Sequence, residues 1–199
     1  MWVPSDDEIR ALHERHAPNP DVFDLVYTHC RIVCQIAEQV LIRHGDPAVD
    51  VGLVRAGCLL HDIGVYRLYD ATGTLDHANY IRHGLLGHEL LRHAGLPEAV
   101  CRFCSCHTGV GITRDDVARQ WLPIPAGDYV AETEEERLVM YADKFHSKSS
   151  PPRFVTAAAY TVAVRRFGED KADLFTAMVR RYGEPDLTDL AAEHGHHIA

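Results

Sequence analysis

Apolar residues recur at helical spacing along almost the whole chain. In residues 21–44 they lie three or four positions apart, which predicts a helix with one apolar face. Gly45 follows the last of them and indicates where this helix ends. The residues of the stripe are Val26, Val33, Ile36 and Val40. We therefore expect a long helix over 21–44 that packs this face against the protein core.

Side chains that cap helices predict where other helices begin. Residues 5–8 and 133–136 each have the spacing of a capping box, with Ser or Thr followed three positions later by Glu. Thr113 indicates a short helix through Asp116, and Pro97 begins another. The remaining expected helices cover about 48–61, about 78–94, and two or three segments within 154–194.

Segments between these helices are polar or broken by proline. Residues 66–77 and 121–132 are expected to be loops. The sequence has no alternating pattern typical of strands and no internal repeat. The predicted fold class is all-α, with residues 1–199 forming a single compact helical domain.

The composition is typical of a globular protein, and its charge argues against some classes of binding partner. Hydrophobic residues make up 46% of the chain and charged residues 25%, with a formal net charge of −9. The acidic balance argues against a nucleic-acid duplex or an anionic membrane surface as the main partner. The sequence has no run of about 20 apolar residues and begins without a signal-like apolar core. We expect a cytoplasmic protein without a membrane span.

The six cysteines are expected to be reduced and buried. Cys101, Cys104 and Cys106 lie close together just before His107 and could suggest a zinc site. A structural zinc site needs four well-placed ligands, and the chain has only one such cluster. Packing of small apolar thiols is therefore the favoured interpretation.

Four polar residues occur where the pattern predicts burial. His29 lies on the apolar stripe of the long helix, and His61 and Asp62 follow an apolar run directly. Asp143 comes four residues after Val139 on another expected helix. Burying such groups without partners costs several kcal/mol, and a divalent ion would satisfy all four together. Two imidazoles and two carboxylates suit Fe, Mn, Co, Ni or Zn better than Mg or Ca.

Further histidines could extend this site to a second ion. His83 precedes Gly84, and His107 lies at the end of a helix. If both point toward the first ion, Asp62 could bridge two metals; otherwise they contact substrate or lie on the surface. His77 and His88 are alternative ligands for a second ion.

The ordered set His29, His61-Asp62 and Asp143 resembles the signature of the HD-domain metal-dependent phosphohydrolases. Residues 61–64 match the HDIG variant letter for letter, and the resemblance covers about 23–150, leaving 151–199 as C-terminal helices. His83-Gly84, His107-Thr108 and Ala142-Asp143-Lys144 are similar to the dinuclear branch. That branch includes dinucleoside-tetraphosphate hydrolases, which typically use iron, and cyclic-dinucleotide phosphodiesterases. A single histidine at 107 and the lack of a Gly-Tyr-Pro motif after it disfavour a cyclic dinucleotide.

The resemblance implies cleavage of a phosphate ester or anhydride in a nucleotide or another small phosphorylated metabolite. One or two divalent transition-metal ions would lower the pKa of bound water toward about 7 and supply hydroxide. Asp62 would be the shared catalytic ligand, and Lys144 a catalytic contact to phosphate. The expected metal ligands are His29, His61, Asp62, His83, His107 and Asp143, and the expected substrate contacts are Arg82, Lys144, Lys148 and Arg153. The alternative is an HD-type di-iron oxygenase, because the same ligand set serves both reactions.

Overall fold

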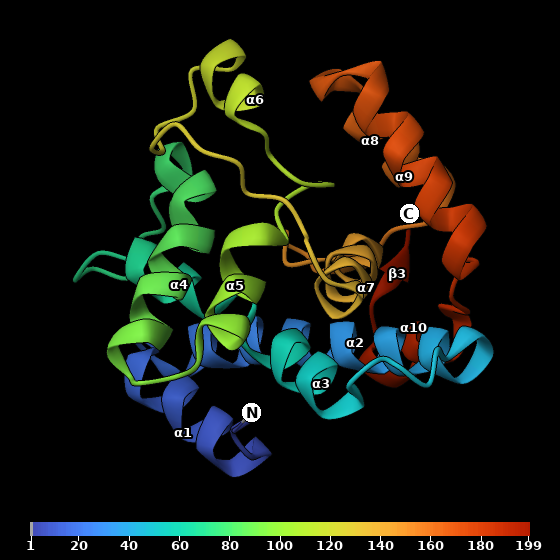
Figure 1. The fold of residues 1–199 in the computed structure, drawn as a ribbon. Helices are drawn as coiled ribbons and strands as arrows, with labels where there is room; N and C mark the ends of the chain where they lie inside the picture. The colour runs from blue at the N-terminus through green and yellow to red at the C-terminus, as the bar shows by residue number, and fades with distance from the viewer. Residues whose placement is uncertain (1) are drawn as a thin grey trace.

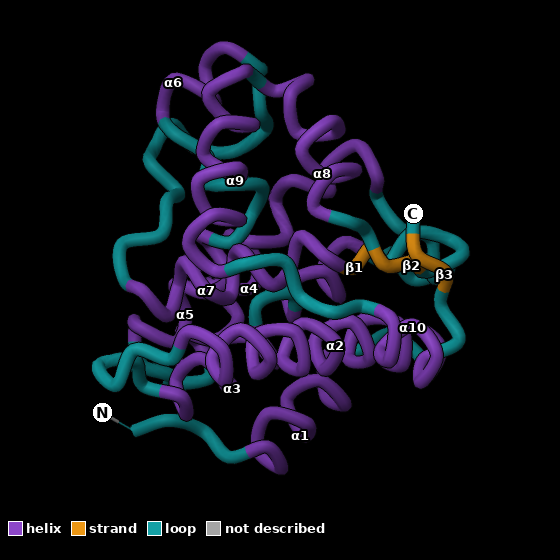
Figure 2. The backbone as a smooth tube through the Cα atoms, turned by 90° about the vertical axis from the view of Figure 1, so that its right-hand side faces the viewer, coloured by secondary structure: helices purple, strands orange, loops and turns teal. Residues whose placement is uncertain are grey.

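A computed structural model describes residues 2–199, which form ten α-helices, short 3-10 segments and a small sheet (Figures 1 and 2). The expectation of an all-α fold is confirmed. The α-helices are α1 (Asp6–His16), α2 (Pro20–His44), α3 (Val51–Leu60), α4 (His83–His93), α5 (Glu98–Cys106), α6 (Arg114–Arg119), α7 (Glu134–Ala142), α8 (Ala157–Val164), α9 (Glu169–Tyr182) and α10 (Thr188–His194). The 3-10 segments are η1 (Ile63–Leu68), η2 (His77–Arg82), η3 (Asp143–Phe145) and η4 (Arg165–Phe167).

The long helix α2 forms the base on which the core is built. Asn19 caps it by accepting a hydrogen bond from the Val22 backbone N–H at 2.9 Å, and Pro20 lies in its first turn. Its apolar stripe is buried, as the sequence pattern predicts. Helices α3 and α7 both pack on α2 and on each other, and α5 packs on α3 and α7. Figure 1 shows α2 running across the lower part of the molecule, above α1, with α7 viewed nearly end-on above α2.

Several predicted boundaries need correction. Residues 78–94 do not form one helix, because η2 precedes α4 and the chain turns more tightly up to Arg82. Such 3-10 turns are common where α-helices begin. The expected loop 66–77 begins inside η1 and ends at the first residue of η2. Helix α6 extends to Arg119 rather than stopping at Asp116.

A small sheet also lies where the sequence shows no strand pattern. Its strands are β1 (His146–Ser147), β2 (Arg153–Phe154) and β3 (His197–Ile198). Strand β1 pairs antiparallel with β2, and β2 pairs in parallel with β3 (Figure 2). Two residues are too few to show alternation, so this sheet is a product of tertiary contacts.

The glycine of the HDIG sequence brings two parts of the fold into contact. A Cβ atom on Gly64 would overlap the carbonyl oxygen of His83 and the backbone nitrogen of Gly87. Only a residue without a side chain therefore lets η1 lie against the first turns of α4. This contact places the segment that follows Asp62 directly beside His83.

A buried ion pair joins α6 to α9. The Lys171 ammonium donates to Asp116 Oδ2 at 2.5 Å and to the Gly111 carbonyl at 3.0 Å, and both charged side chains are buried. Asp116 also accepts hydrogen bonds from Thr113 and Arg119. Burial alone would raise the pKa of Asp116. The hydrogen bonds from Lys171 and Thr113 lower it by more, so the pKa lies well below 3.8.

We expect Lys171→Met to lower the free energy of unfolding at pH 7 by about 2 kcal/mol, the typical value for a hydrogen bond to a charged group. Because the folded-state pKa of Asp116 is depressed, its stabilisation is present above pH 4 and is lost as the pH falls through that depressed value. The difference between variant and wild type should therefore shrink below pH 4. Urea unfolding at pH 7 and pH 3 measures it, and a penalty that grows with acid would contradict the assignment.

Candidate metal centre

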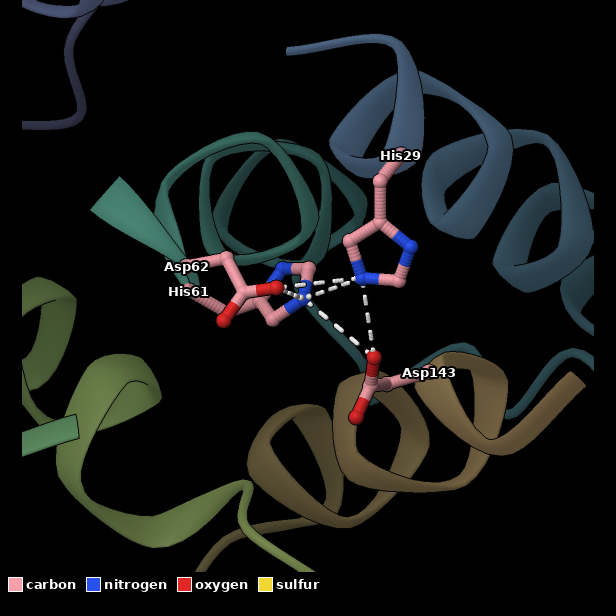
Figure 3. Close-up of side chains that lie close together, drawn as sticks. All are labelled: His29, His61, Asp62 and Asp143. Atoms are coloured by element: carbon pink, nitrogen blue, oxygen red, sulfur yellow. Dashed lines mark hydrogen bonds and ion pairs between the residues drawn. The ribbon is translucent and has the colours of Figure 1, made fainter. Parts of the chain in front are cut away.

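Four side chains from three segments converge at one point (Figure 3). His29 projects from α2, His61 and Asp62 follow the last turn of α3, and Asp143 caps the end of α7. Because α3 and α7 both end here, their terminal residues turn toward the space beside α2. His29, His61 and Asp62 are almost fully buried, and 15% of the Asp143 side chain is exposed.

The facing atoms of these residues are all hydrogen-bond acceptors when the imidazoles are neutral and carry their proton on Nδ1. His29 Nε2 lies 3.1 Å from Asp143 Oδ1, 3.2 Å from Asp62 Oδ2 and 3.2 Å from His61 Nε2. One ligand atom from each of the four residues lies within 4.8 Å of all the others. His61 Nδ1 is within 2.7 Å of the Cys58 carbonyl oxygen, which can only accept, so the neutral ring directs a lone pair from Nε2 into the cluster. Such a set of converging lone pairs fits a cation.

A second group shares Asp62 with the first. Asp62 Oδ1 lies 3.5 Å from His83 Nε2 and 3.6 Å from His107 Nε2, and the two histidine nitrogens are 3.1 Å apart. Asp62 therefore presents one oxygen to each group, as expected for a bridging carboxylate. All three residues are buried. Neither ligand group found within residues 2–199 contains a cysteine, and the six cysteines are buried free thiols, as expected.

Electrostatics prepares both groups for a cation. Burial raises the pKa of Asp62 and of Asp143, but Lys148 beside Asp62 and Lys144 beside Asp143 lower them, and both end well below 3.8. Burial lowers the pKa of His83 to about 4, although Asp62 acts in the opposite direction. At neutral pH the site therefore offers ionised carboxylates and a neutral His83 imidazole. Burial lowers the pKa of His61, but the Asp62 carboxylate raises it by more, to well above 6.5, so a metal ion bound here must displace a proton from His61.

Both lysines that the sequence predicted as substrate contacts lie beside the carboxylates of the site. Lys144 donates to Asp143 Oδ2 at 2.6 Å and to the His107 carbonyl at 3.0 Å. Lys148 donates to Asp62 Oδ2. Both lysine side chains are largely buried, so their charges act in a poorly solvated environment.

A cavity of about 550 Å³ opens at this site. It reaches His29 and Asp143, and both Lys148 and Arg153 lie along it. Arg82 is exposed on η2 and is not one of the residues that line this cavity, so the structure does not bring it to the site. His77 lines the cavity without joining either ligand group, while His88 lies elsewhere and bonds Ser105 Oγ at 3.0 Å. Three tyrosines also line the cavity, which the sequence pattern did not indicate: Tyr69, Tyr80 and Tyr160.

His146 is the polar residue of this region that the sequence analysis missed. It lies in β1, three residues after Asp143, and its Nδ1 is 2.9 Å from His29 Nδ1. Burial, then the neighbouring His29 and His196, lower the pKa of His146 to about 2, so its ring is neutral. The only sequence signal for additional histidines at the site is the high histidine content, 14 of 199 residues.

Similar proteins include both archaeal sequences and a bacterial structure. An uncharacterized protein of Methanocaldococcus jannaschii is 37% identical over 59% of this chain and 64% of its own length. A tRNA (cytidine(56)-2'-O)-methyltransferase of Picrophilus torridus is 34% identical over 73% of this chain, and the corresponding Thermoplasma volcanium enzyme is 31% identical over 60%. The chain spans only 37% and 31% of the lengths of these two methyltransferases.

The fold resembles the HD domain of the Listeria monocytogenes phosphodiesterase PgpH. In complex with cyclic-di-AMP, that domain superposes with a TM-score of 0.52 at 16% identity, over 89% of this chain and 98% of that one. A second PgpH HD domain structure gives a TM-score of 0.51 at 17% identity, over 86% and 97% of the two chains. The HD domain family model matches residues 26–148, which is more than half of the chain. The chain therefore belongs to the HD domain family.

Proposed function

We propose that this protein is a metal-dependent phosphohydrolase that cleaves a phosphate ester or anhydride of a nucleotide or a similar small phosphorylated metabolite. The observation that carries the proposal is the pair of ligand groups that share Asp62 beside a cavity containing Lys148. Membership of the HD domain family and the likeness of the fold to a phosphodiesterase domain support it.

The residues fit one or two divalent transition-metal ions. The first group, His29, His61, Asp62 and Asp143, offers two imidazoles and two carboxylates, and the second, Asp62, His83 and His107, offers one carboxylate and two imidazoles. This mixture favours Fe, Mn, Co, Ni or Zn over Mg or Ca. A bound divalent ion lowers the pKa of coordinated water and offsets the charge that develops on phosphoryl oxygens.

The protein's own cations would orient the phosphate. Lys148 lies both at Asp62 and along the cavity, so its ammonium can contact a phosphate oxygen held next to the ligand groups. Arg153 lies further along the same cavity and can contact another phosphate or a charged substituent. Lys144 is bonded to Asp143 and to the His107 carbonyl, so we assign it to holding the Asp143 carboxylate in place.

The volume and the aromatic lining of the cavity favour a nucleotide over inorganic phosphate as the ligand. Its volume of about 550 Å³ lies within the range of pockets that enclose small organic ligands. Tyr69, Tyr80 and Tyr160 supply aromatic surface for a planar base. The similar PgpH domain is in complex with cyclic-di-AMP, which also carries adenine bases, and its likeness to this chain is one of fold.

The direct test is substrate hydrolysis, followed by chromatographic separation of the products, by protein loaded separately with Fe²⁺, Mn²⁺, Co²⁺, Ni²⁺ or Zn²⁺. The panel should contain mononucleotides, dinucleoside polyphosphates, cyclic dinucleotides and phosphorylated sugars. We expect hydrolysis of at least one nucleotide class and none after chelation. Consumption of O₂ with the iron-loaded protein, without hydrolysis of any compound, would contradict the hydrolase proposal and favour the oxygenase.

We expect Lys148→Gln to raise KM for the best substrate about tenfold, because a hydrogen bond to a charged group contributes about 1.5–3 kcal/mol. Lys148→Arg keeps the charge and should retain more of the affinity. Arg180→Gln removes an exposed charge on α9 and is the matched control. Steady-state kinetics of the three variants measures KM for this substrate. An unchanged KM in Lys148→Gln would show that Lys148 does not contact the phosphate.

A further inference from the structure

The four candidate histidine ligands are oriented in two different ways. His61 Nδ1 lies 2.7 Å from the Cys58 carbonyl, His83 Nδ1 lies 2.6 Å from that of Tyr80, and His107 Nδ1 lies 2.9 Å from that of Phe103. Each of these three rings is thus held by a backbone group of the preceding turn. His29 differs, because its Nδ1 faces a side chain, His146, that lies 117 residues further along the chain.

His146 continues this contact outward to a third histidine. Its Nε2 is 3.0 Å from His196 Nδ1, so the rings of His29, His146 and His196 form a row. Successive rings are nearly parallel, with interplanar angles of 29° and 21° and centroids 5.2 and 5.1 Å apart. Phe154 packs edge-on against His146 at 5.0 Å and completes its buried surroundings.

Hydrogen-bond direction in this row follows from the role of His29. A His29 ring that offers the Nε2 lone pair to a metal carries its proton on Nδ1 and must donate it. His146 then accepts at Nδ1 and donates from Nε2, and His196 accepts at Nδ1. Each ring therefore has one tautomer and one orientation, as is common where a partner fixes a metal-binding histidine.

The outer end of the row is held by residues 194–199. Strand β3 pairs with β2, the Ala199 N–H donates to the Phe154 carbonyl at 2.9 Å, and the Thr156 N–H donates to the Ala199 carbonyl at 3.0 Å. His194 Nε2 lies 2.9 Å from Gln35 Oε1 on α2, the helix that carries His29. Figure 2 shows β3 beside β2 and α10 near the end of α2. His196 is thus placed by backbone pairing on one side and by α2 on the other.

We propose that His146 is a positioning residue that fixes His29 for metal binding, and that His196 couples residues 194–199 to the metal centre through it. The inference rests on the proposed metal site. It assigns a role to a residue outside the HD motif and to a segment outside the family match, which ends at residue 148.

The test is a Co²⁺ titration of chelator-treated protein, followed by visible absorption and by competition with a chromophoric chelator. Loss of a histidine's outer hydrogen bond typically weakens metal binding by about 10–100-fold, which is the loss we expect at one ion position for His146→Leu. His146→Gln keeps one acceptor and one donor and should restore most of the affinity. His196→Ala should weaken binding several-fold, whereas His197→Ala changes the exposed neighbour in β3 and should have no effect.

Thermal unfolding of the metal-free variants separates positioning from folding. If His146→Leu does not fold, the comparison of His196→Ala with His197→Ala still tests the inference. His196 is only partly buried, so its replacement should leave the fold intact. Equal Co²⁺ affinity and equal spectra in wild type, His146→Leu and His196→Ala would overturn the inference while leaving the hydrolase proposal intact. Conversely, the expected affinity pattern together with inactivity on every phosphate compound would support the inference and remove the proposed function.

Discussion

Asp62→Ala is expected to lower the rate of substrate hydrolysis at least about a hundredfold, because metal ions stabilise the transition state by several kcal/mol and each 1.36 kcal/mol is a factor of ten. Asp62 is the one residue with an oxygen in each of the two ligand groups found in residues 2–199. Its Oδ2 lies 3.2 Å from His29 Nε2 and its Oδ1 lies 3.5 Å from His83 Nε2. Removing it weakens both groups at once and leaves the Lys148 ammonium without its carboxylate.

The measurement is kcat/KM on the best substrate, with far-ultraviolet circular dichroism to confirm folding. Asp62→Asn keeps the shape of the side chain without its charge and should lose nearly as much activity. Asp173→Ala removes an exposed carboxylate on α9 and serves as the matched control. Activity of Asp62→Ala within a few-fold of wild type would show that the carboxylate between the two groups takes no part in catalysis.

His107→Ala is expected to reduce the metal content from two ions per chain to one. His107 Nε2 belongs to the second group alone, 3.1 Å from His83 Nε2, whereas the four ligands of the first group remain intact in this variant. The ion that stays should therefore be the one held by His29, His61, Asp62 and Asp143. The rate of substrate hydrolysis should fall together with the lost ion, because Asp62 then binds only one metal.

Elemental analysis of protein purified without added metal or chelator measures the content directly. His88→Ala is the control, since His88 lies on α4 with His83 but bonds Ser105 instead of the site. One ion per chain in both wild type and His107→Ala would restrict the metal centre to the first group. A content of zero in wild type would contradict the metal site itself.

Helix periodicity explains why the residues of the first candidate ligand group could be picked out from sequence. His29 occurs within an apolar stripe, and His61, Asp62 and Asp143 occur where apolar helices end, so local pattern alone predicts that they turn inward. The fold class follows from the same periodicity. These features depend on neighbours three or four residues away, and they are therefore visible in a single sequence.

Other features depend on contacts between distant segments, which no local pattern reports. His146 and His196 meet through a sheet whose strands have two residues each. Lys144, expected to contact phosphate, bonds a carbonyl 37 residues earlier. Arg82 was expected to contact the substrate, but it lies exposed on η2, outside the cavity.

The close approach of backbone segments at Gly64 fixes the distance between the two ligand groups. Asp62 precedes η1 and His83 begins α4, and these segments meet where a Cβ on Gly64 would overlap the His83 carbonyl and the Gly87 nitrogen. The separation of the two ligand groups is therefore set by a contact between two backbone segments, which moves far less than side chains that can rotate. Phosphates of different substrates would meet the same fixed spacing, so differences between substrates would be read by the tyrosine-lined cavity rather than by the metal centre.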